Sequence, residues 1–424
     1  MRMQMQMQMM DHFPGPTERL TRLSIMSVAS SVAIVALLAS CAQPSAIRQP
    51  APPAPPEAVA ATPAPELPPA DSVIVSKLID PAVAERVALS IPPAAQAPVL
   101  RPAHIALLIP ANSKNLAQAA EAVKLGFTAG AQAEGANALA FRIYASDDEV
   151  GSLATQYRKA AQEGAVAMVG GITRDGANAL AKESGRLPTL ALNAPTEADL
   201  PDRFFYISLN IDNEARQLAR SAAEMGFLRA AVLVGGTPLA KRIQESFERE
   251  WSRLGGQIAV RTTLSGEANA YAQLHATIER ATADMAFIAA DSTAARNARP
   301  YLPTALPVFA TSHSLDARAQ PVQNVDLESV HFLEMPWFVE KDHPAVMAYA
   351  KPANTLPLDY ERLYALGVDA WRLAQIILKT ERTRDIAPLD GVTGKLTLDG
   401  AQFVRTLTSV EIRDGVPYVF RPGE

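Results

Sequence analysis

Short apolar runs alternate with amphipathic segments along the chain from about His104 onward. Most runs are apolar at every position, which is typical of strands buried on both faces of a parallel sheet. The segments between them repeat apolar residues at helical spacing. Such alternation indicates an α/β fold with right-handed crossovers. We predict strands at residues 105–109, 138–144, 166–169, 189–192, 230–234, 258–264, 285–289 and 308–310, and helices at 116–134, 151–163, 177–184, 213–225, 240–254 and 271–281.

The C-terminal part of this region has a different pattern. Residues 360–378 repeat apolar side chains at i, i+3, i+4 and i+7, which predicts one long helix with a broad apolar stripe. Residues 391–400 alternate as a strand does and end in an Asp-Gly turn, so we expect a hairpin with residues 403–412.

The globular region, residues 103–424, is too long for one such sheet with a single core, so we expect two lobes. The first covers about residues 103–210 and receives the long helix when the C-terminal part of the chain returns to it. The second covers about residues 211–340. The predicted fold class is therefore α/β, a two-lobed fold with parallel sheets flanked by helices, which follows a disordered tether.

The N-terminus has the pattern of a secretory signal. Three arginines precede an apolar stretch at residues 25–38, which is short for a membrane span. The stretch ends in Leu38-Ala39-Ser40-Cys41, which resembles the bacterial lipobox and contains the single cysteine of the protein. This resemblance implies that residues 1–40 are a lipoprotein signal peptide, that Cys41 is lipidated, and, with Ala42 next, that the anchor lies in the outer membrane. The alternative is a buried core cysteine behind an uncleaved anchor.

Residues 41–102 are rich in proline and alanine. Runs such as residues 52–56 cannot form a helix or a central strand, and they favour the extended polyproline II conformation. We predict a semi-rigid tether that begins at the lipidated cysteine. The alternative is a motif that docks into an aromatic-lined groove of another protein.

Composition excludes several kinds of protein. A net charge of -5 and a pI near 5.8 give no electrostatic footprint for nucleic acid, so we expect no nucleic-acid partner. One cysteine excludes a disulfide framework and a Cys-rich zinc site. The six histidines are scattered along the chain, and we expect no metal and no cofactor.

Parallel α/β sheets bind ligands in the loops that follow the carboxyl ends of their strands. Those loops supply candidate residues for a cleft between the lobes. Gly170 and Gly171 would let backbone amides approach an anion at a helix N-terminus. The alternative is a tight turn, with Thr173 as a helix cap. The candidate cleft residues are Asn112, Ser113, Gly170, Gly171, Thr173, Asn193, Gly236, Asp291 and Ser312.

The remaining polar motifs do not indicate an enzyme. Asp147-Asp148 is typical of a solvated loop or a helix cap rather than a metal pair. Ser312-His313 with Asp316 suggests a nucleophilic triad, but neighbours on one loop do not easily face one reacting atom, and a G-x-S-x-G elbow is absent. The sequence contains no P-loop and no G-x-G-x-x-G before a helix.

Residues 334–338 combine apolar and aromatic side chains with a proline. Trp337 and Phe338 are candidates for binding a partner, because aromatic residues carry many interface hot spots. The alternative is a segment of the core that crosses between the lobes.

Several motifs along the globular part resemble one known family, the LppC-type lipoproteins, which are LpoA-type activators of penicillin-binding proteins. The resemblance covers about residues 104–420. The motifs are Thr189-Leu190-Ala191-Leu192-Asn193, Phe205-Tyr206, Asp212-Asn213-Glu214-Ala215-Arg216-Gln217, Ala295-Arg296-Asn297-Ala298-Arg299-Pro300, Val308-Phe309-Ala310-Thr311-Ser312, Glu334-Met335-Pro336-Trp337, Leu366-Gly367-Val368-Asp369-Ala370 and Gly391-Val392-Thr393-Gly394-Lys395-Leu396.

The resemblance implies a type I periplasmic-binding-protein-like domain in a lipoprotein that catalyses no reaction itself. It implies a class A penicillin-binding protein as the partner, and activation of peptidoglycan synthesis from the outer membrane. Longer family members carry a domain of helical repeats before this one, and the proline-rich tether stands in its place here. The alternative from the fold is a lipid-anchored receptor that binds a small molecule, such as an amino acid, in the cleft between the lobes.

Overall fold

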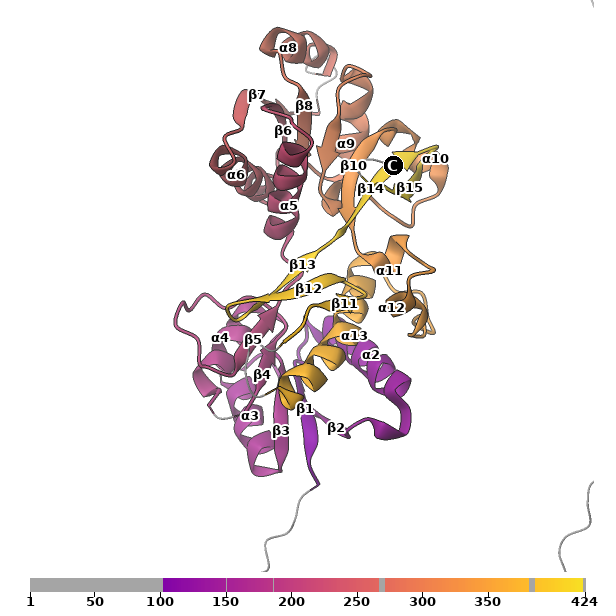
Figure 1. Cartoon of the computed structure of the whole chain (residues 1–424). Coiled ribbons are helices and arrows are strands. Elements are labelled where there is room, and N and C mark those ends of the chain that lie inside the picture. Colours follow the sequence, from indigo (N-terminus) through magenta and orange to yellow (C-terminus); the bar gives the residue numbers. More distant parts are fainter. Residues whose placement is uncertain (1–101, 150, 186, 267–270, 381–385, 422–424) are drawn as a thin grey trace, which may run out of the picture. The chain divides into compact units, whose positions relative to one another are not determined.

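The computed structural model describes residues 102–149, 151–185, 187–266, 271–380 and 386–421 (Figure 1). All of them belong to the compact unit Pro93–Glu424. The predicted signal peptide, Cys41 and the tether lie outside the described residues. None of the described helices is long and apolar enough to span a bilayer.

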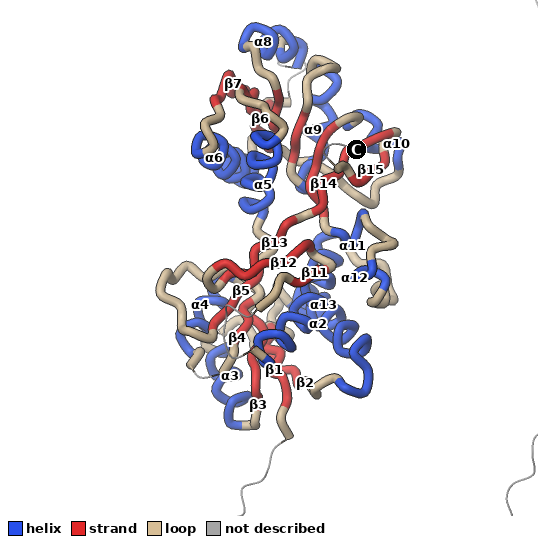
Figure 2. Tube along the Cα trace, in the orientation of Figure 1, coloured by secondary structure: helices blue, strands red, loops and turns tan. Residues whose placement is uncertain are grey.

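The first sheet is built mainly from the N-terminal half of the described chain (Figures 1 and 2). Its strands are β1 (His104–Ile109), β2 (Phe141–Ala145), β3 (Ala165–Gly170), β4 (Thr189–Ala191), β5 (Phe204–Ile207), β11 (Leu389–Gly391), β12 (Gly394–Asp399) and β13 (Gln402–Thr406). Their order is β11-β12-β13-β5-β4-β3-β1-β2. The strands from β1 to β5 are parallel, and β13 joins β5 in parallel while β12 and β11 pair antiparallel.

The second sheet has the order β15-β14-β10-β9-β8-β6-β7. Its strands are β6 (Arg229–Gly235), β7 (Gln257–Leu264), β8 (Met285–Ala289), β9 (Val308–Ala310), β10 (Val330–Glu334), β14 (Thr408–Arg413) and β15 (Val416–Val419). The strands from β6 to β10 are parallel, whereas β14 and β15 pair antiparallel. The predicted two-lobed α/β class is confirmed, although both sheets are mixed rather than wholly parallel.

Each sheet has helices on both faces. The helices are α2 (Ala117–Glu134), α3 (Ser152–Gln162), α4 (Arg174–Glu183), α5 (Ile211–Glu224), α6 (Pro238–Arg253), α8 (Leu274–Ala281), α9 (Ser292–Ala298), α10 (Pro321–Asn324), α11 (Pro336–Val339), α12 (Pro344–Met347) and α13 (Leu358–Lys379). On the first sheet α2 and α13 cover one face, and α3 and α4 the other. On the second, α5 and α6 lie opposite α8 and α9. We call each sheet with its helices a lobe.

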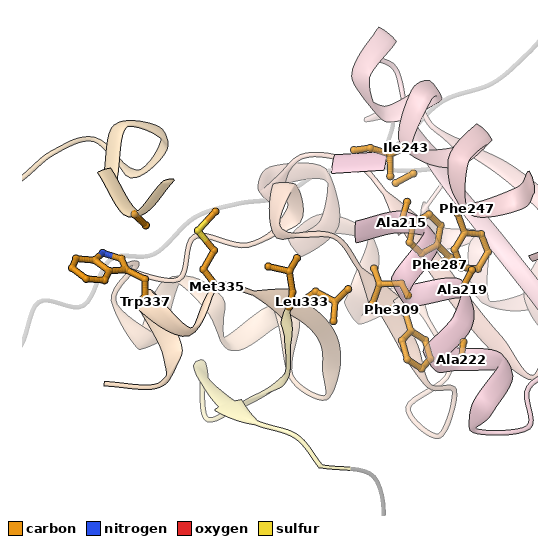
Figure 3. Close-up of a cluster of buried hydrophobic side chains, with 14 of the residues drawn as sticks. Ala215, Ala219, Ala222, Ile243, Phe247, Phe287, Phe309, Leu333, Met335 and Trp337 are labelled. Atoms are coloured by element: carbon orange, nitrogen blue, oxygen red, sulfur yellow. The ribbon is translucent and has the colours of Figure 1, made fainter. Parts of the chain in front are cut away.

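The strands are buried on both faces because their alternate side chains enter two different cores. In β1, Ile105 and Leu107 pack toward α2 and α13, whereas Ala106 and Leu108 pack toward α3 and α4. Figure 3 shows the corresponding cluster under α5 and α6, where Phe247, Phe287 and Phe309 meet. That cluster continues through Leu333, Met335 and Trp337 to Tyr364 of α13, so apolar packing links the two lobes.

Three features differ from the sequence prediction. Residues 403–412 are not one strand: β13 ends at Thr406 in the first sheet, and β14 begins at Thr408 in the second. Strands β5 and β10 are additional parallel strands. Strand β15 is an additional edge strand. The long helix α13 packs along α2 of the first lobe.

Close packing of α13 on α2 depends on glycines at the crossing. A methyl group added at Gly367 would lie 2.3 Å from the Val123 carbonyl oxygen, and one at Gly126 would lie 1.9 Å from that of Tyr364. At Gly130 the obstacle would be Cβ of Trp371, at 2.7 Å. Backbone atoms of the two helices therefore touch, and no side chain fits between them.

We predict that Gly367→Ala destabilises the protein. Alanine is favoured over glycine within a helix by about 1 kcal/mol, but a clash with the α2 backbone costs about 3 kcal/mol, the upper end of the usual range, so we expect a net loss of about 2 kcal/mol. Urea unfolding measures this loss. Gly236→Ala is the control, because nothing lies within 4 Å of its added Cβ. Equal stability of the two variants would contradict the close crossing.

Candidate functional site

The chain passes between the lobes at three places, which lie together at one junction. The first passage is Ser208–Asn210, between β5 and α5, and the second begins at Met335, after β10. The third is Leu407, a single residue between β13 and β14. We call this region the junction.

Two acidic side chains from the second lobe and two arginines from the first form a charge cluster at the junction. The carboxylate of Glu334, which is 1% exposed, accepts a hydrogen bond from Nη2 of Arg362 at 2.8 Å. Glu214, which is also buried, accepts hydrogen bonds from N and Oγ of Ser312 at 3.1 and 2.8 Å. Arg405 donates from Nε to the Ser208 carbonyl at 3.0 Å.

We call Glu214, Glu334, Arg362 and Arg405 the junction cluster. Burial and neighbouring charges together shift the pKa values of Glu214, Arg405 and Arg362. Desolvation raises the pKa of Glu214, and the charge of Glu334 adds to that effect while Arg405 opposes it. Desolvation lowers the pKa of Arg405, with the neighbouring carboxylates acting in the opposite direction. For Arg362, burial works to lower the pKa, but Glu334 and Glu214 raise it above its ordinary value. Charges from the other lobe therefore offset part of the effect of burial on Glu214 and Arg405, and they outweigh it for Arg362.

Backbone groups at the junction are also held by side chains. The side-chain amide of Gln217, on α5, bonds both backbone groups of Leu407. Its Nε2 donates to the Leu407 carbonyl at 3.0 Å, and its Oε1 accepts from the Leu407 N–H at 3.0 Å. Asp369, on α13, is fully buried and accepts from the backbone N–H groups of Val392 and Thr393 and from the Thr393 hydroxyl. Burial raises the pKa of Asp369, and the bonds from Thr393 oppose this shift. These contacts fix the third passage and the turn beside it.

Many of the motifs that carry the family resemblance meet at this junction. Glu214 and Gln217 come from one motif, Ser312 from a second, Glu334 and Trp337 from a third, and Asp369 from a fourth. The candidate residues from sequence did not include the charge cluster. Two of its members lie inside quoted motifs, but nothing in the sequence indicates that Arg362 and Arg405 complete it.

The candidate cleft residues of the first lobe serve mainly as turns and caps. Ser113 accepts hydrogen bonds from the N–H groups of residues 115 and 116, and Asn112 is exposed. Thr173 caps α4 by accepting from the Gly176 N–H at 3.0 Å. A Cβ at Gly170 would lie 2.0 Å from the Leu108 carbonyl oxygen, and Gly171 has a φ of 65°. The turn-and-cap alternative therefore accounts for the local geometry of this loop.

The other candidates have similar local partners. Asn193 donates to the Ile172 carbonyl and accepts from the Ala194 N–H. Asp291 caps α9 by accepting from the N–H groups of residues 293 and 294. Ser312 is buried against Glu214 at the junction. Gly236 is exposed, with open space around it.

Five of the candidate residues line three separate hollows instead of surrounding one. Gly171 and Thr173 line a hollow of about 550 Å³ beside Asp147 and Asp148. Gly236 and Asp291 line another of about 500 Å³ in the second lobe. Asn193 lines a hollow of about 480 Å³ to which both lobes contribute, through Ser208 and Arg242. Arg242 is already paired with Asp212 there, at 2.7 Å.

Trp337 is a core residue in this structure, which corrects its proposed place on a binding surface. The side chain is 1% exposed, and its Nε1 donates to Glu361 at 3.0 Å. Lys351 Nζ lies 3.4 Å from the centre of the indole, and the Tyr364 ring packs at 5.5 Å. Phe338 is half-buried against the same cluster. The lobe-crossing alternative therefore describes Trp337.

Across the described ranges, no group of three or more His, Cys, Asp or Glu side chains is arranged to hold a metal ion. The bonds from Arg362 to Glu334 and from Gln217 to Leu407 at the junction join the two lobes.

The family model and the curated relatives agree on one family. The family model described as "LppC putative lipoprotein" matches residues 95–279 and 267–415. A curated relative, "Penicillin-binding protein activator LpoA" of Klebsiella pneumoniae, is 25% identical over 274 residues, which are 56% of this chain and 39% of that protein. The protein of the same name in Yersinia pseudotuberculosis is 27% identical, and the match covers 65% of this chain and 49% of that protein. The chain thus spans less than half of each of these two relatives.

Two solved structures match the described unit over their whole length. One, from Chromobacterium violaceum, is titled a putative branched-chain amino acid ABC transporter; it is 33% identical, has a TM-score of 0.65 and covers 73% of this chain. The other is the C-domain of LpoA from Haemophilus influenzae, described as a regulator of PBP1A, with 19% identity, a TM-score of 0.60 and 75% coverage of this chain. Both of those chains are covered over their full length, so in each of them this fold occurs without a further domain.

We predict that removing one partner of the Arg362–Glu334 ion pair lowers the free energy of unfolding more than removing both partners does. Arg362→Met leaves the Glu334 carboxylate buried without its partner, and we expect a loss of about 3 kcal/mol. The double variant Arg362→Met with Glu334→Met removes both charges, and we expect it to be more stable than the single variant. Chemical denaturation of the three proteins measures both differences.

The control for this prediction is Arg261→Met. Arg261 bonds Glu248 at 2.7 Å, but its side chain is 57% exposed, so we expect a loss of less than about 1 kcal/mol. If the double variant loses more stability than Arg362→Met alone, the cluster is not a set of mutually dependent charges.

Proposed function

The chain belongs to the LppC lipoprotein family, and on that basis we propose that it binds and activates a class A penicillin-binding protein. In this proposal Cys41 carries the lipid anchor, the outer membrane is its location, and the chain regulates peptidoglycan synthesis through contact with the synthase. The family match carries the proposal, because it extends over nearly the whole of the described unit.

The relatives support this function through their names. The curated relatives are named as activators of penicillin-binding proteins, and the H. influenzae domain is described as a regulator of one. The part that they share with this chain includes both lobes. We propose that this unit alone contacts the synthase, and that residues 41–102 supply reach from the membrane.

The geometry of the unit also supports an interaction role. Arg362 and Glu334 bond one another across the junction, and Gln217 of the second lobe bonds Leu407 between the two sheets, so polar contacts link the two lobes at their centre. We propose that the protein is not an enzyme. The Ser312 hydroxyl, which the sequence offered as a nucleophile, donates to Glu214 and is buried.

A second candidate function is a receptor for a small ligand such as an amino acid. The specific observation in its favour is the 33% identity to the C. violaceum structure, whose title names an amino acid ABC transporter. The hollow that includes Asn193 and Arg242 would be the place for that ligand. Calorimetry with the common amino acids tests this function without any synthase.

We predict that the fragment Pro93–Glu424 binds a class A penicillin-binding protein of the same cell and raises its transpeptidase rate. The fragment would be immobilised and offered each synthase, and the rate would then be measured in solution as the fragment concentration increases. Saturable binding with a matching rise in rate is the expected result.

An amino-acid-binding protein of the same two-lobed fold is the matched control, because it has the architecture without the family motifs. The full lipidated chain in detergent should raise the transpeptidase rate of the synthase to the same extent as the fragment. If neither protein binds any class A synthase, the activator function fails.

A further inference from the structure

His331 lies in a row of side chains that crosses the second sheet near its C-terminal edge. On β10 it pairs with Phe309 of β9 on one side and with Glu411 of β14 on the other. The next strand, β15, is the edge of the sheet, and it lies beside β14 in Figure 1. Just after β15, the Phe420 N–H donates to the Ser409 carbonyl at 2.8 Å. His331 is therefore placed between the interior of the sheet and the C-terminal end of the chain.

Two aromatic rings enclose the imidazole of His331. The Phe309 ring stacks on it with the ring centres 5.0 Å apart, and the Phe420 ring meets it at 4.7 Å and an angle of 62°. Phe309 is 1% exposed, whereas Phe420 is half-buried, so Phe420 is the ring that can move into solvent.

The environment of Nδ1 suits a neutral ring. This atom is buried and has no hydrogen-bond partner in the described part of the chain. A neutral imidazole can leave one ring nitrogen without a proton, but an imidazolium has two N–H groups, and each needs an acceptor or water. A second proton on His331 is therefore unfavourable while the Phe420 ring stays in place.

Neighbouring charges do not supply the missing partner. Glu411 lies opposite His331, but its carboxylate is paired with Arg413 at 2.7 Å. Charged side chains of the other elements near this face are paired, hydrogen-bonded or exposed; they are Arg220 and Glu224 of α5, Glu334 of β10, Glu340 after α11 and Arg421 after β15. An imidazolium here would thus find no unpaired buried carboxylate among the described residues.

We propose that His331 is an acid switch for the C-terminal edge of the second sheet. A second proton on its imidazole displaces the Phe420 ring, admits water to Nδ1 and loosens β15. Strand β14 stays in place, because Val410 and Ile412 are packed in the core on the other face of the sheet. The switch does not rest on the proposed function.

The direction of the switch follows from the burial of His331. Desolvation lowers the pKa of this histidine; Glu411 opposes the shift and Arg413 adds to it. A histidine with a lowered pKa in the folded protein stabilises the fold above about pH 6.5, its ordinary value, and this contribution is lost as the pH falls through the lowered value. The edge is therefore held at neutral pH and loosened in acid.

Hydrogen exchange of the full chain at pH 7 and pH 5, followed by mass spectrometry, tests the switch. Each rate is divided by the intrinsic exchange rate at the same pH, so that only protection by structure is compared. We expect protection of residues 416–420 to fall about tenfold between pH 7 and pH 5. Protection of β8, in the middle of the same sheet, should not change.

Three variants separate the switch from general acid sensitivity. His331→Phe keeps an aromatic ring at this position but cannot take up a proton, so protection of residues 416–420 should be equal at the two pH values. Phe420→Ala removes the cover, so protection there should be low at both. His275→Gln is the matched control, because it removes a half-exposed histidine from α8 and should keep the fall.

Three outcomes would overturn the inference. They are equal protection of residues 416–420 at pH 7 and pH 5 in the unsubstituted chain, a fall in His331→Phe as large as in that chain, and a loss of protection in acid that includes β8. Urea unfolding at pH 7 establishes that His331→Phe is folded. None of these measurements involves a synthase, so the inference and the proposed function can fail separately.

Discussion

Mutual compensation of buried charges across the junction is the constraint on which the rest of the structure depends. Glu214 and Glu334 come from one lobe, and Arg362 and Arg405 from the other. A buried carboxylate or guanidinium is unfavourable by several kcal/mol unless its opposite charge and its hydrogen bonds are in place. The two lobes therefore satisfy each other's polar groups, and each depends on the other to remain in this arrangement.

The strands were predictable from sequence where both of their faces are buried. Residues 105–109 and 285–289 are apolar throughout, and β1 and β8 lie at those positions. Strand β10 was missed because it contains His331 and Glu334, and their burial depends on partners that the local sequence does not contain. The change of sheet at Leu407 could not be predicted, because residues on both sides of it have the alternation of a strand.

The candidate site was predictable only at the level of local chemistry. Thr173 and Asp291 have the residue types and positions of helix caps, and they are caps. The junction cluster joins residues 214, 334, 362 and 405, so its members become neighbours only after both sheets and α13 have formed. Residue type alone could not show whether Trp337 is a core residue or an exposed anchor for a partner. Its burial and its hydrogen bond to Glu361 show that it is a core residue.

Leu407 places a condition on the evolution of this fold. This single residue connects β13 and β14, which belong to two different sheets, and Gln217 bonds both of its backbone groups. Side chains alternate between the two faces of a sheet, so one residue inserted or deleted here would turn Val410 and Ile412 out of the second core. A substitution at Leu407 changes one side chain, whereas an insertion or deletion there changes which side chains of β14 face the core. Descent is therefore expected to conserve the number of residues between β13 and β14 more strictly than their identity.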